Sequence, residues 1–252
     1  MSRLYVIASP IGNMEDITMR AARVLREDVD LVFCEDTRQT RKLLNHLGLG
    51  LPAYSLHSHS TEARINQAVN ALLDGKKIAY LTDAGTPGIS DPGARLVQEA
   101  AKSGIPVIPL PGPSALTALI SACGFPDKEV IFAGFLSKKD GRRKNELKRL
   151  GEFDGLIVVY ESPHRIIKLL AAIDEIFPGR EIVIGREMTK IHEEFIRGSA
   201  SEILKKMAAV RVRCPLLNDE GLCEMYEARP VTCRIYGVPT AIGGQAHSCR
   251  HS

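Results

Sequence analysis

Residues 81–93 read LTDAGTPGISDPG, an apolar strand end followed by an aspartate and then by glycines separated by prolines and small hydroxyl residues. Glycine has no Cβ, so another molecule can approach its backbone N–H and C=O groups closely. Pro87 and Pro92 stiffen the segment that presents those groups. We interpret the segment as a ligand-binding loop after a strand; the alternative is an elaborate turn, because turns use the same residue types.

Two further loops of this kind leave strand-like runs. SPIGN, residues 9–13, follows LYVIA, and PGPSA, residues 111–115, follows IPVIPL and opens a helical pattern over 114–122. In open α/β sheets ligands bind outside the carboxyl ends of strands, so we expect the three loops to share one crevice. Neither GxGxxG nor GxxxxGK[ST] occurs in the chain, which argues against a dinucleotide fingerprint and against a P-loop.

Strand-like runs alternate with helical patterns along most of the chain. This alternation predicts an α/β fold with a mostly parallel sheet covered on both faces. The last strand-like runs lie close together, so the second half is expected to be mixed. We predict an α/β domain over 1–112, a second over 113–207 and an irregular cysteine-rich tail over 208–252, with the crevice between the first two.

Composition places the chain among globular proteins. Its 252 residues are 44% hydrophobic and 25% charged, enough for a sizeable core and two domains. No apolar run approaches the length of a membrane span and no signal segment opens the sequence, so we expect a cytoplasmic protein with no membrane partner. A net charge of +3 does not by itself imply a nucleic-acid partner.

Charge is nevertheless concentrated in residues 138–149, KKDGRRKNELKR, where seven basic residues outnumber two acidic ones for a local charge of +5. Such a cluster can neutralise phosphates and makes this run a candidate RNA-binding surface. The alternative is a solvated helix face or a mobile loop. The candidate RNA contacts are Lys138, Lys139, Arg142, Arg143 and Lys144.

Four of the six cysteines fall in the last 39 residues: Cys214, Cys223, Cys233 and Cys249. In a cytoplasmic protein a cysteine cluster indicates metal before disulfide. Thiolates prefer zinc or an iron–sulfur centre. No CxxC pair is present, so free thiols in a loose tail are the alternative.

Eight segments, in order across residues 3–207, closely resemble the bacterial 16S rRNA cytidine 2′-O-ribose methyltransferases of the tetrapyrrole-methylase-like superfamily. The segments are SPIGNMEDIT, FCEDTRQTRKLL, LHSHSTEAR, LTDAGTPGISDPG, PGPSALTALISACGF, FAGFLSKKDGRRK, YESPHRI and GREMTKIHEEFIRG. The resemblance implies a class III methyltransferase whose two α/β domains enclose S-adenosylmethionine. It also implies a homodimer and, as substrate, a cytidine ribose 2′-hydroxyl in 16S rRNA of the small ribosomal subunit.

Carried onto this sequence, the resemblance assigns the methyl donor to all three loops. The implied contacts are Pro10, Asp83, Ala84, Gly85, Thr86, Ser114 and Ala115. Asp83 can accept a hydrogen bond from a ribose hydroxyl or an ammonium group. Ser114 also fits a helix N-cap, where its side-chain oxygen would accept from a backbone N–H group.

A ribose hydroxyl is a weak nucleophile until a base assists it. Candidate catalytic residues are Glu35 and Asp36 at a strand end, Glu161 and His164 in YESPHR, and Glu187 and Lys190 in GREMTK. No spacing selects among them. Ion pairing or helix capping explains each acid equally well.

After SEILKKM the sequence departs from this family, and the second domain is expected to lack its last strand. Residues 214–239, CPLLNDEGLCEMYEARPVTCRIYGVP, instead resemble the later half of a cysteine-cluster family that chelates zinc or iron. Two other functions therefore remain open. One is an inactive donor-binding module; the other is a small-molecule methylase of the same superfamily.

Overall fold

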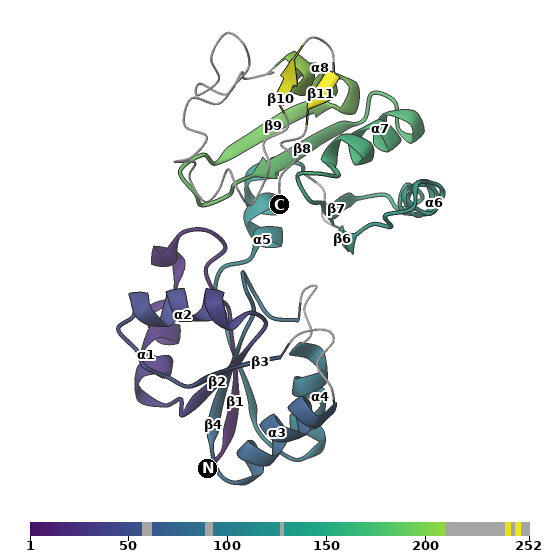
Figure 1. Ribbon diagram of the computed structural model, residues 1–252. Helices are drawn as coiled ribbons and strands as arrows, with labels where there is room; N and C mark the ends of the chain where they lie inside the picture. The colour runs from purple at the N-terminus through teal and green to yellow at the C-terminus, as the bar shows by residue number, and fades with distance from the viewer. Residues whose placement is uncertain (57–61, 89–92, 127–128, 210–239, 243–244, 248–252) are drawn as a thin grey trace.

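Five parallel strands form the first sheet, in the order β3-β2-β4-β1-β5 (Figure 1). The computed structural model describes residues 1–56, 62–88, 93–126, 129–209, 240–242 and 245–247. The strands are β1 (Arg3–Ile7), β2 (Leu31–Cys34), β3 (Ala53–Ser55), β4 (Lys77–Leu81) and β5 (Val107–Leu110). Because all five run the same way, their carboxyl ends lie at one edge of the sheet.

Helices cover both faces of this sheet, as Figure 1 shows. The covering helices are α1 (Met19–Glu27), α2 (Thr37–His46), α3 (Glu62–Leu73) and α4 (Gly93–Lys102). In β4, Ala79 and Leu81 pack toward α1 and α2, whereas Ile78 and Tyr80 pack toward α3 and α4. Successive strand residues point to opposite faces, so a doubly covered strand must be apolar throughout.

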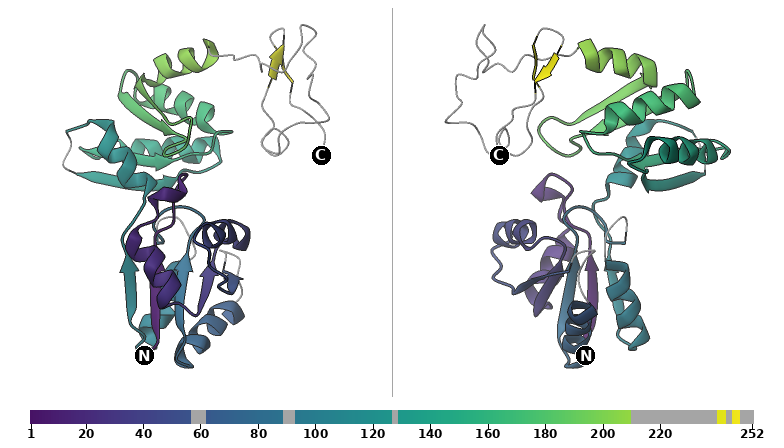
Figure 2. Two further views of the ribbon diagram at one scale, coloured as in Figure 1. Left: turned by 90° about the vertical axis from the view of Figure 1, so that its left-hand side faces the viewer. Right: turned by 45° about the vertical axis from the view of Figure 1, so that its right-hand side comes forward.

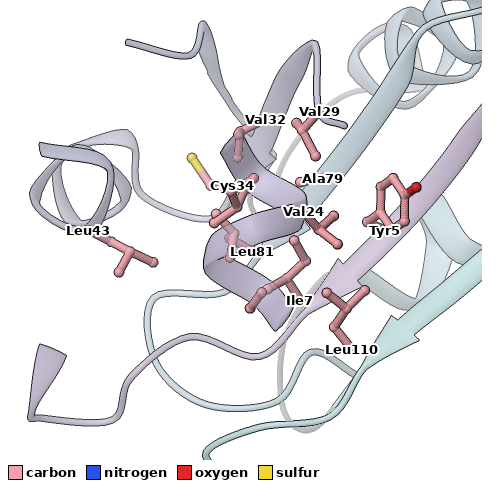
Figure 3. Close-up of a cluster of buried hydrophobic side chains, with 12 residues drawn as sticks. Tyr5, Ile7, Val24, Val29, Val32, Cys34, Leu43, Ala79, Leu81 and Leu110 are labelled. Atoms are coloured by element: carbon pink, nitrogen blue, oxygen red, sulfur yellow. The ribbon is translucent and has the colours of Figure 1, made fainter. Parts of the chain in front are cut away.

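The cluster under α1 and α2 illustrates this packing (Figure 3). Ile7, Val32 and Leu81 come from three strands and are fully buried beside Val24 of α1 and Leu43 of α2. Thr18 caps α1 by accepting from the Ala21 N–H group. The helix therefore begins where a cap is available and turns its apolar stripe to the sheet.

The second part of the chain lies beyond the carboxyl edge of the first sheet, in Figure 1 and in both views of Figure 2. Its elements are α5 (Ala115–Cys123), β6 (Val130–Phe135), α6 (Asp140–Leu150), β7 (Leu156–Tyr160), α7 (Ile166–Ile176), β8 (Glu181–Arg186), β9 (Glu194–Ser199) and α8 (Ala200–Ala209). Strands β6 and β7 pair in parallel, and β8 and β9 pair antiparallel. Both pairing types occur, but the described residues form two separate pairs.

Two apolar clusters hold this second part together. Leu147 of α6 and Leu169 of α7 pack with partly buried residues of β6 and β7. Leu170, on the neighbouring position of α7, packs instead with Ile203 of α8 and with isoleucines of β8 and β9. Helix α7 therefore joins the two strand pairs into one unit.

The predicted α/β class is confirmed, and the strand and helix positions agree closely with the sequence patterns. The sequence did not decide between a helix and a loop for α6, and four short elements were not predicted: β3, the 3-10 helix η1 (Met14–Asp16), β10 (Thr240–Ile242) and β11 (Gln245–His247). Each has three residues, which is too short for a periodicity to be read. The boundary at residue 112 stays a prediction; the first sheet ends with Leu110.

Beyond α8 the structure describes one short hairpin, β10 (Thr240–Ile242) with β11 (Gln245–His247). The expected loss of a last strand falls mainly on residues 210–239, outside the described ranges. Within those ranges, no helix combines the length and the apolar character that crossing a membrane requires.

Adjacent leucines of α3 test the packing of the first sheet. Leu72 is fully buried, whereas Leu73 is 60% exposed. We expect Leu72→Ala to lower the free energy of unfolding by about 2–5 kcal/mol. Leu73→Ala should change it by no more than about 0.5 kcal/mol. Urea unfolding of both variants checks this, and equal losses would mean that α3 presents another face to the sheet.

Candidate active site

The first two loops are joined by a pair of backbone hydrogen bonds between Ser9 and Gly85. The Ser9 N–H group donates to the Gly85 carbonyl at 3.0 Å, and the Gly85 N–H group donates back at 2.9 Å. The Ser9 hydroxyl donates to the Thr82 carbonyl at 2.9 Å. The Thr82 hydroxyl in turn donates to the Gly85 carbonyl at 3.0 Å. The turn over residues 82–85 is therefore held by a bond within itself and by the bonds to Ser9.

The third loop is joined to the other two. The Thr86 hydroxyl donates to the Pro113 carbonyl at 2.9 Å. Gly112 lies so close to the first loop that an added Cβ would stand 2.9 Å from the Cβ of Ala8. The structure thus brings together the three loops that the sequence placed in one crevice.

Gly85 stands where the three loops meet. Its φ of +85° is in the left-handed region that favours glycine. An added Cβ would contact the Ile11 side chain at 3.4 Å and approach the Pro113 carbonyl oxygen at 3.8 Å. A side chain at this position would therefore occupy the space between the loops, which the glycine leaves open.

Asp83 and Asp36 are neighbours with different roles. Asp36 is the N-cap of α2: its carboxylate accepts from the Arg38 N–H group at 2.8 Å and pairs with the Arg38 guanidinium at 2.7 Å. Arg38 thereby lowers the pKa of Asp36. Asp83 accepts from the Asp36 N–H group at 2.9 Å, and burial raises its pKa despite that bond. Asp36 thus serves the helix, while Asp83 keeps a partly desolvated carboxylate in the second loop.

Ser114 occupies the N-cap of α5 in an extended conformation, but its side chain makes no capping hydrogen bond. The expected position is correct and the expected bond is absent. Ala115 begins the helix next to it. The nearly buried Ser114 hydroxyl is thus not used by the helix and can serve a ligand.

The loop after β8, residues 187–190, closes on the first loop. The Asn13 N–H group donates to the Thr189 hydroxyl at 3.1 Å. A Cβ on Gly12 would lie 2.6 Å from Cγ of Lys190. Glu187 and Thr189 have positive φ angles of 52° and 65°, a strained backbone of the kind concentrated at functional sites.

Within this loop the Lys190 ammonium group pairs with the Glu187 carboxylate at 3.2 Å. Lys190 therefore lies beside the first loop, and the Glu187 carboxylate neutralises its positive charge. Glu35 follows β2, and its N–H group donates to the Leu81 carbonyl at 3.3 Å, next to the second loop.

Glu161 belongs to a buried network of the second part. One carboxylate oxygen accepts from the Ser162 N–H group at 2.8 Å, and the other lies 3.0 Å from the Arg165 guanidinium. Arg165 also donates to the Leu136 carbonyl at 2.7 Å, which ties the end of β7 to the end of β6. Glu161 thus takes part in a structural network, although its Oε2 has no hydrogen-bond partner in the described part of the chain; His164, on the same turn, is exposed. The catalytic candidates occupy three separate loops, and their roles stay predictions.

Two aromatic residues escaped the sequence analysis. Tyr160 ends β7; burial raises its pKa, and a hydrogen bond from the backbone of Leu116 in α5 partly offsets that effect. Phe135 ends β6, lies 5.8 Å from the Tyr160 ring and is 57% exposed. Both lie in segments that carry the family resemblance, FAGFLSKKDGRRK and YESPHRI, and each closes a strand-like run, which is the signal that could have singled them out.

The basic run forms α6 and the turn before it, but it is not uniformly exposed. Arg143 is buried at 3% exposure and pairs with Asp140, so it does not belong to the exposed surface predicted for it. Lys144 pairs with Glu175 of α7 at 2.6 Å. Lys138, Lys139 and Arg142 are exposed and remain the predicted RNA contacts.

The metal prediction on Cys214, Cys223, Cys233 and Cys249 lies outside the described residues. Within the described ranges, no three histidine, cysteine or acidic side chains group as metal ligands. Cys34 and Cys123 are buried free thiols there.

Comparison with protein families covers most of the chain. The family model for tetrapyrrole (corrin/porphyrin) methylases matches residues 3–204. The chain belongs to this family. The resemblance read from the eight sequence segments is thereby confirmed.

Known relatives agree with that assignment. Two proteins named "Ribosomal RNA small subunit methyltransferase I" are each 47% identical to this methylase. The one from Leptospira biflexa aligns over 77% of this chain and 80% of its own length. The one from Thermotoga maritima aligns over 81% and 91%. The fold matches the uroporphyrin-III C-methyltransferase from Thermus thermophilus complexed with S-adenosyl homocysteine, with a TM-score of 0.56, 18% identity and coverage of 81% and 91%.

A second family model, CxxCxxCC, described as a zinc- or iron-chelating domain, matches residues 181–250. It overlaps the methylase match over 181–204. In the structure, Ile182, Ile184 and Ile196 of this overlap pack with Leu170 of α7. Residues 181–204 are therefore part of the folded methylase unit.

Gly12 tests the contact between the two parts. A Cβ there would collide with Thr189 Oγ1 at 2.8 Å and with the Met188 carbonyl oxygen at 2.9 Å. We expect Gly12→Ala to displace residues 187–190 and to speed amide hydrogen exchange in them. Gly50→Ala is the matched control, because a Cβ at Gly50 meets no atom within 4 Å. Unchanged exchange in Gly12→Ala would show that the loop does not rest on Gly12.

Proposed function

We propose that this chain transfers a methyl group from S-adenosylmethionine to the 2′-hydroxyl of a cytidine ribose in 16S rRNA of the small ribosomal subunit. The observation that carries the proposal is the joining of three strand-end loops around Gly85. The relatives named as small-subunit ribosomal RNA methyltransferases supply the substrate class. The related fold complexed with S-adenosyl homocysteine supplies the donor class.

The residues of the three loops fit the donor. Gly85 leaves space between the loops, Asp83 offers a carboxylate, and the Ser114 hydroxyl is not used in helix capping. The residues that would hold the donor are Pro10, Asp83, Ala84, Gly85, Thr86, Ser114 and Ala115. When bound, S-adenosylmethionine supplies a methyl group on a positively charged sulfur that leaves as a neutral thioether.

The chain's own contribution is to position the ribose hydroxyl and to accept its proton. Alignment of the two reacting groups supplies much of the rate in a transfer of this kind. Asp36 and Glu161 are engaged in a helix cap and a buried ion pair, which disfavours them as bases. Glu35, beside the second loop, is the preferred candidate for accepting the proton, whereas Lys190, whose ammonium group pairs with Glu187 beside the first loop, is a candidate for positioning the hydroxyl.

RNA binding is assigned to the exposed basic residues Lys138, Lys139 and Arg142, which follow the end of β6. Phe135, at that strand end, offers an exposed ring on which an unstacked base can rest. A charged surface beside an aromatic platform suits a single-stranded segment of rRNA.

An inactive donor-binding module is the second candidate function. It is favoured by one observation: the methylase match ends at residue 204, and a second family begins inside it. A small-molecule methylase is less well supported, because relatives at 47% identity are named for ribosomal RNA.

The proposal also includes a homodimer in the cytoplasm. Ile191 is 96% exposed and Phe195 is 38% exposed, so the β8–β9 region offers apolar area to a second copy. Sedimentation equilibrium of the full chain distinguishes monomer from dimer.

Mass spectrometry of ribose methylation tests the reaction. Small ribosomal subunits that lack the mark are incubated with the full chain and S-adenosylmethionine. We expect methyl incorporation at one cytidine 2′-oxygen. Donor binding by calorimetry without incorporation would support the inactive module; absence of both would overturn the proposal.

A pair of glycine variants tests the donor site. Gly85→Val places a side chain between the loops and should weaken binding of S-adenosylmethionine by about 1–3 kcal/mol through overpacking. Gly75→Val is the matched control, because Gly75 has a similar φ of +90° and no atom within 4 Å of an added Cβ. Both variants lose stability through backbone strain. Only Gly85→Val should lose donor affinity; equal affinities on folded protein would place the donor elsewhere.

A further inference from the structure

A basic hollow of about 380 Å³ lies between α6 and α7, on elements separate from the three donor loops. Its lining residues are Lys138, Asp140, Arg143, Lys144, Lys168, Ala171, Ala172 and Glu175. Four of these side chains are cationic and two are anionic. The hollow therefore carries an excess of positive charge after its internal ion pairs are counted.

Arg143 is the unusual member of this lining. It is 97% buried, and one terminal nitrogen pairs with Asp140. Its Nε–H group is buried without a hydrogen-bond partner. The Nε–H group is covered by protein atoms, so a molecule in the hollow reaches it only if the Arg143 side chain moves; a buried donor left unpaired is costly, which favours such a move.

The other cations fall into two groups. Lys144 is neutralised by Glu175 at 2.6 Å and by Asp140 at 3.4 Å. Lys138 and Lys168 pair with no carboxylate in the described part of the chain, although both line the hollow. Two exposed ammonium groups and a buried guanidinium that line one hollow suit an anion with several acceptor oxygens.

The size and shape of the hollow agree with such an anion. Ala171 and Ala172 of α7 have small side chains and leave the space open. The first turn of α6, which begins at Asp140, lacks a side-chain cap, and its N–H groups add positive potential on that side. Asp140 opposes this potential, but its carboxylate already pairs with Arg143 and Lys144.

We propose that this hollow binds a phosphate group of the RNA backbone, outside the crevice where methyl transfer occurs. The inference rests on the proposed function for the identity of the polymer. The same chemistry would accept free phosphate, so the two sources must be separated by experiment. A phosphate held here would anchor the RNA to α6 and α7 while another nucleotide reaches the donor loops.

The first arm measures RNA binding by fluorescence anisotropy with a fragment of 16S rRNA over a range of salt concentrations. Lys168→Met removes one cation from the hollow, and Lys148→Met removes an exposed cation of α6 that does not line it. We expect Lys168→Met to raise the dissociation constant about fivefold or more and to lower the salt slope by about 0.7–0.9, one phosphate contact. Lys148→Met should change both less.

A second pair adds charge instead of removing it. Ala171→Glu places a carboxylate at the exposed rim, and Asn145→Glu makes the same charge change on exposed α6 outside the hollow. Only Ala171→Glu should weaken RNA binding to the extent seen in Lys168→Met. Calorimetry with S-adenosylmethionine should give the parent affinity for all four variants, which confirms that they are folded.

The second arm titrates the full chain with inorganic phosphate against chloride at constant ionic strength and follows the amide resonances of Lys168 and Ala171. Shifts in these resonances, together with the RNA effect, support the proposal. Resonance shifts without an effect on RNA binding would reassign the hollow to free phosphate. If the resonances do not shift and RNA binding is not weakened, the proposal is overturned. If Lys168→Met weakens RNA binding but the parent chain does not methylate the ribose, the hollow keeps its assignment and only the proposed reaction is refuted.

Discussion

The two hydrogen bonds between Ser9 and Gly85 are the constraint on which the rest of the site depends. They fix the ends of two neighbouring parallel strands to each other beyond the sheet, where the strand ladder itself has stopped. Thr82, Thr86 and Pro113 then extend the joint to a third strand end. These bonds join backbone groups or small hydroxyl side chains, so the positions of the loops follow closely from the positions of the strand ends.

The second part of the chain depends on that joint in a different way. Residues 187–190 rest on Gly12 in the first loop, and this position tolerates no side chain. Glu187 and Thr189 accept an unfavourable backbone conformation in doing so. A strained segment held against a loop of the other part is a means of coupling the two parts, because movement of either releases the same contact.

Most of the fold could be predicted from the sequence, for a physical reason. Strands covered on both faces must be apolar where they are covered, as residues 78–81 show, and amphipathic helices must alternate with them. The convergence of the three loops followed from the common direction of those strands. Short elements such as Ala53–Ser55 were missed because their position comes from pairing with Val32–Cys34, which no local pattern reveals.

The site was less predictable because similar residues have different surroundings. Asp36 and Asp83 look alike in sequence, yet one caps a helix and the other remains partly desolvated in a loop. Arg142 and Arg143 are adjacent, yet only the first is exposed. Burial of Arg143 depends on α7, which lies more than twenty residues further along the chain. Charge counting therefore located the basic run but not its division into a surface and an interior.

The position of α8 has a consequence for how the chain was assembled. Ala200 and Ile203 complete the core formed by α7, β8 and β9, and the helix ends at Ala209. The segments recognised by the two family models thus overlap from β8 into α8, all within one folded unit. A sequence joined after this point need not reshape the methylase interior, because Ala200 and Ile203 already fill the core beside α7; substitutions at these two positions of α8 therefore meet a packing constraint.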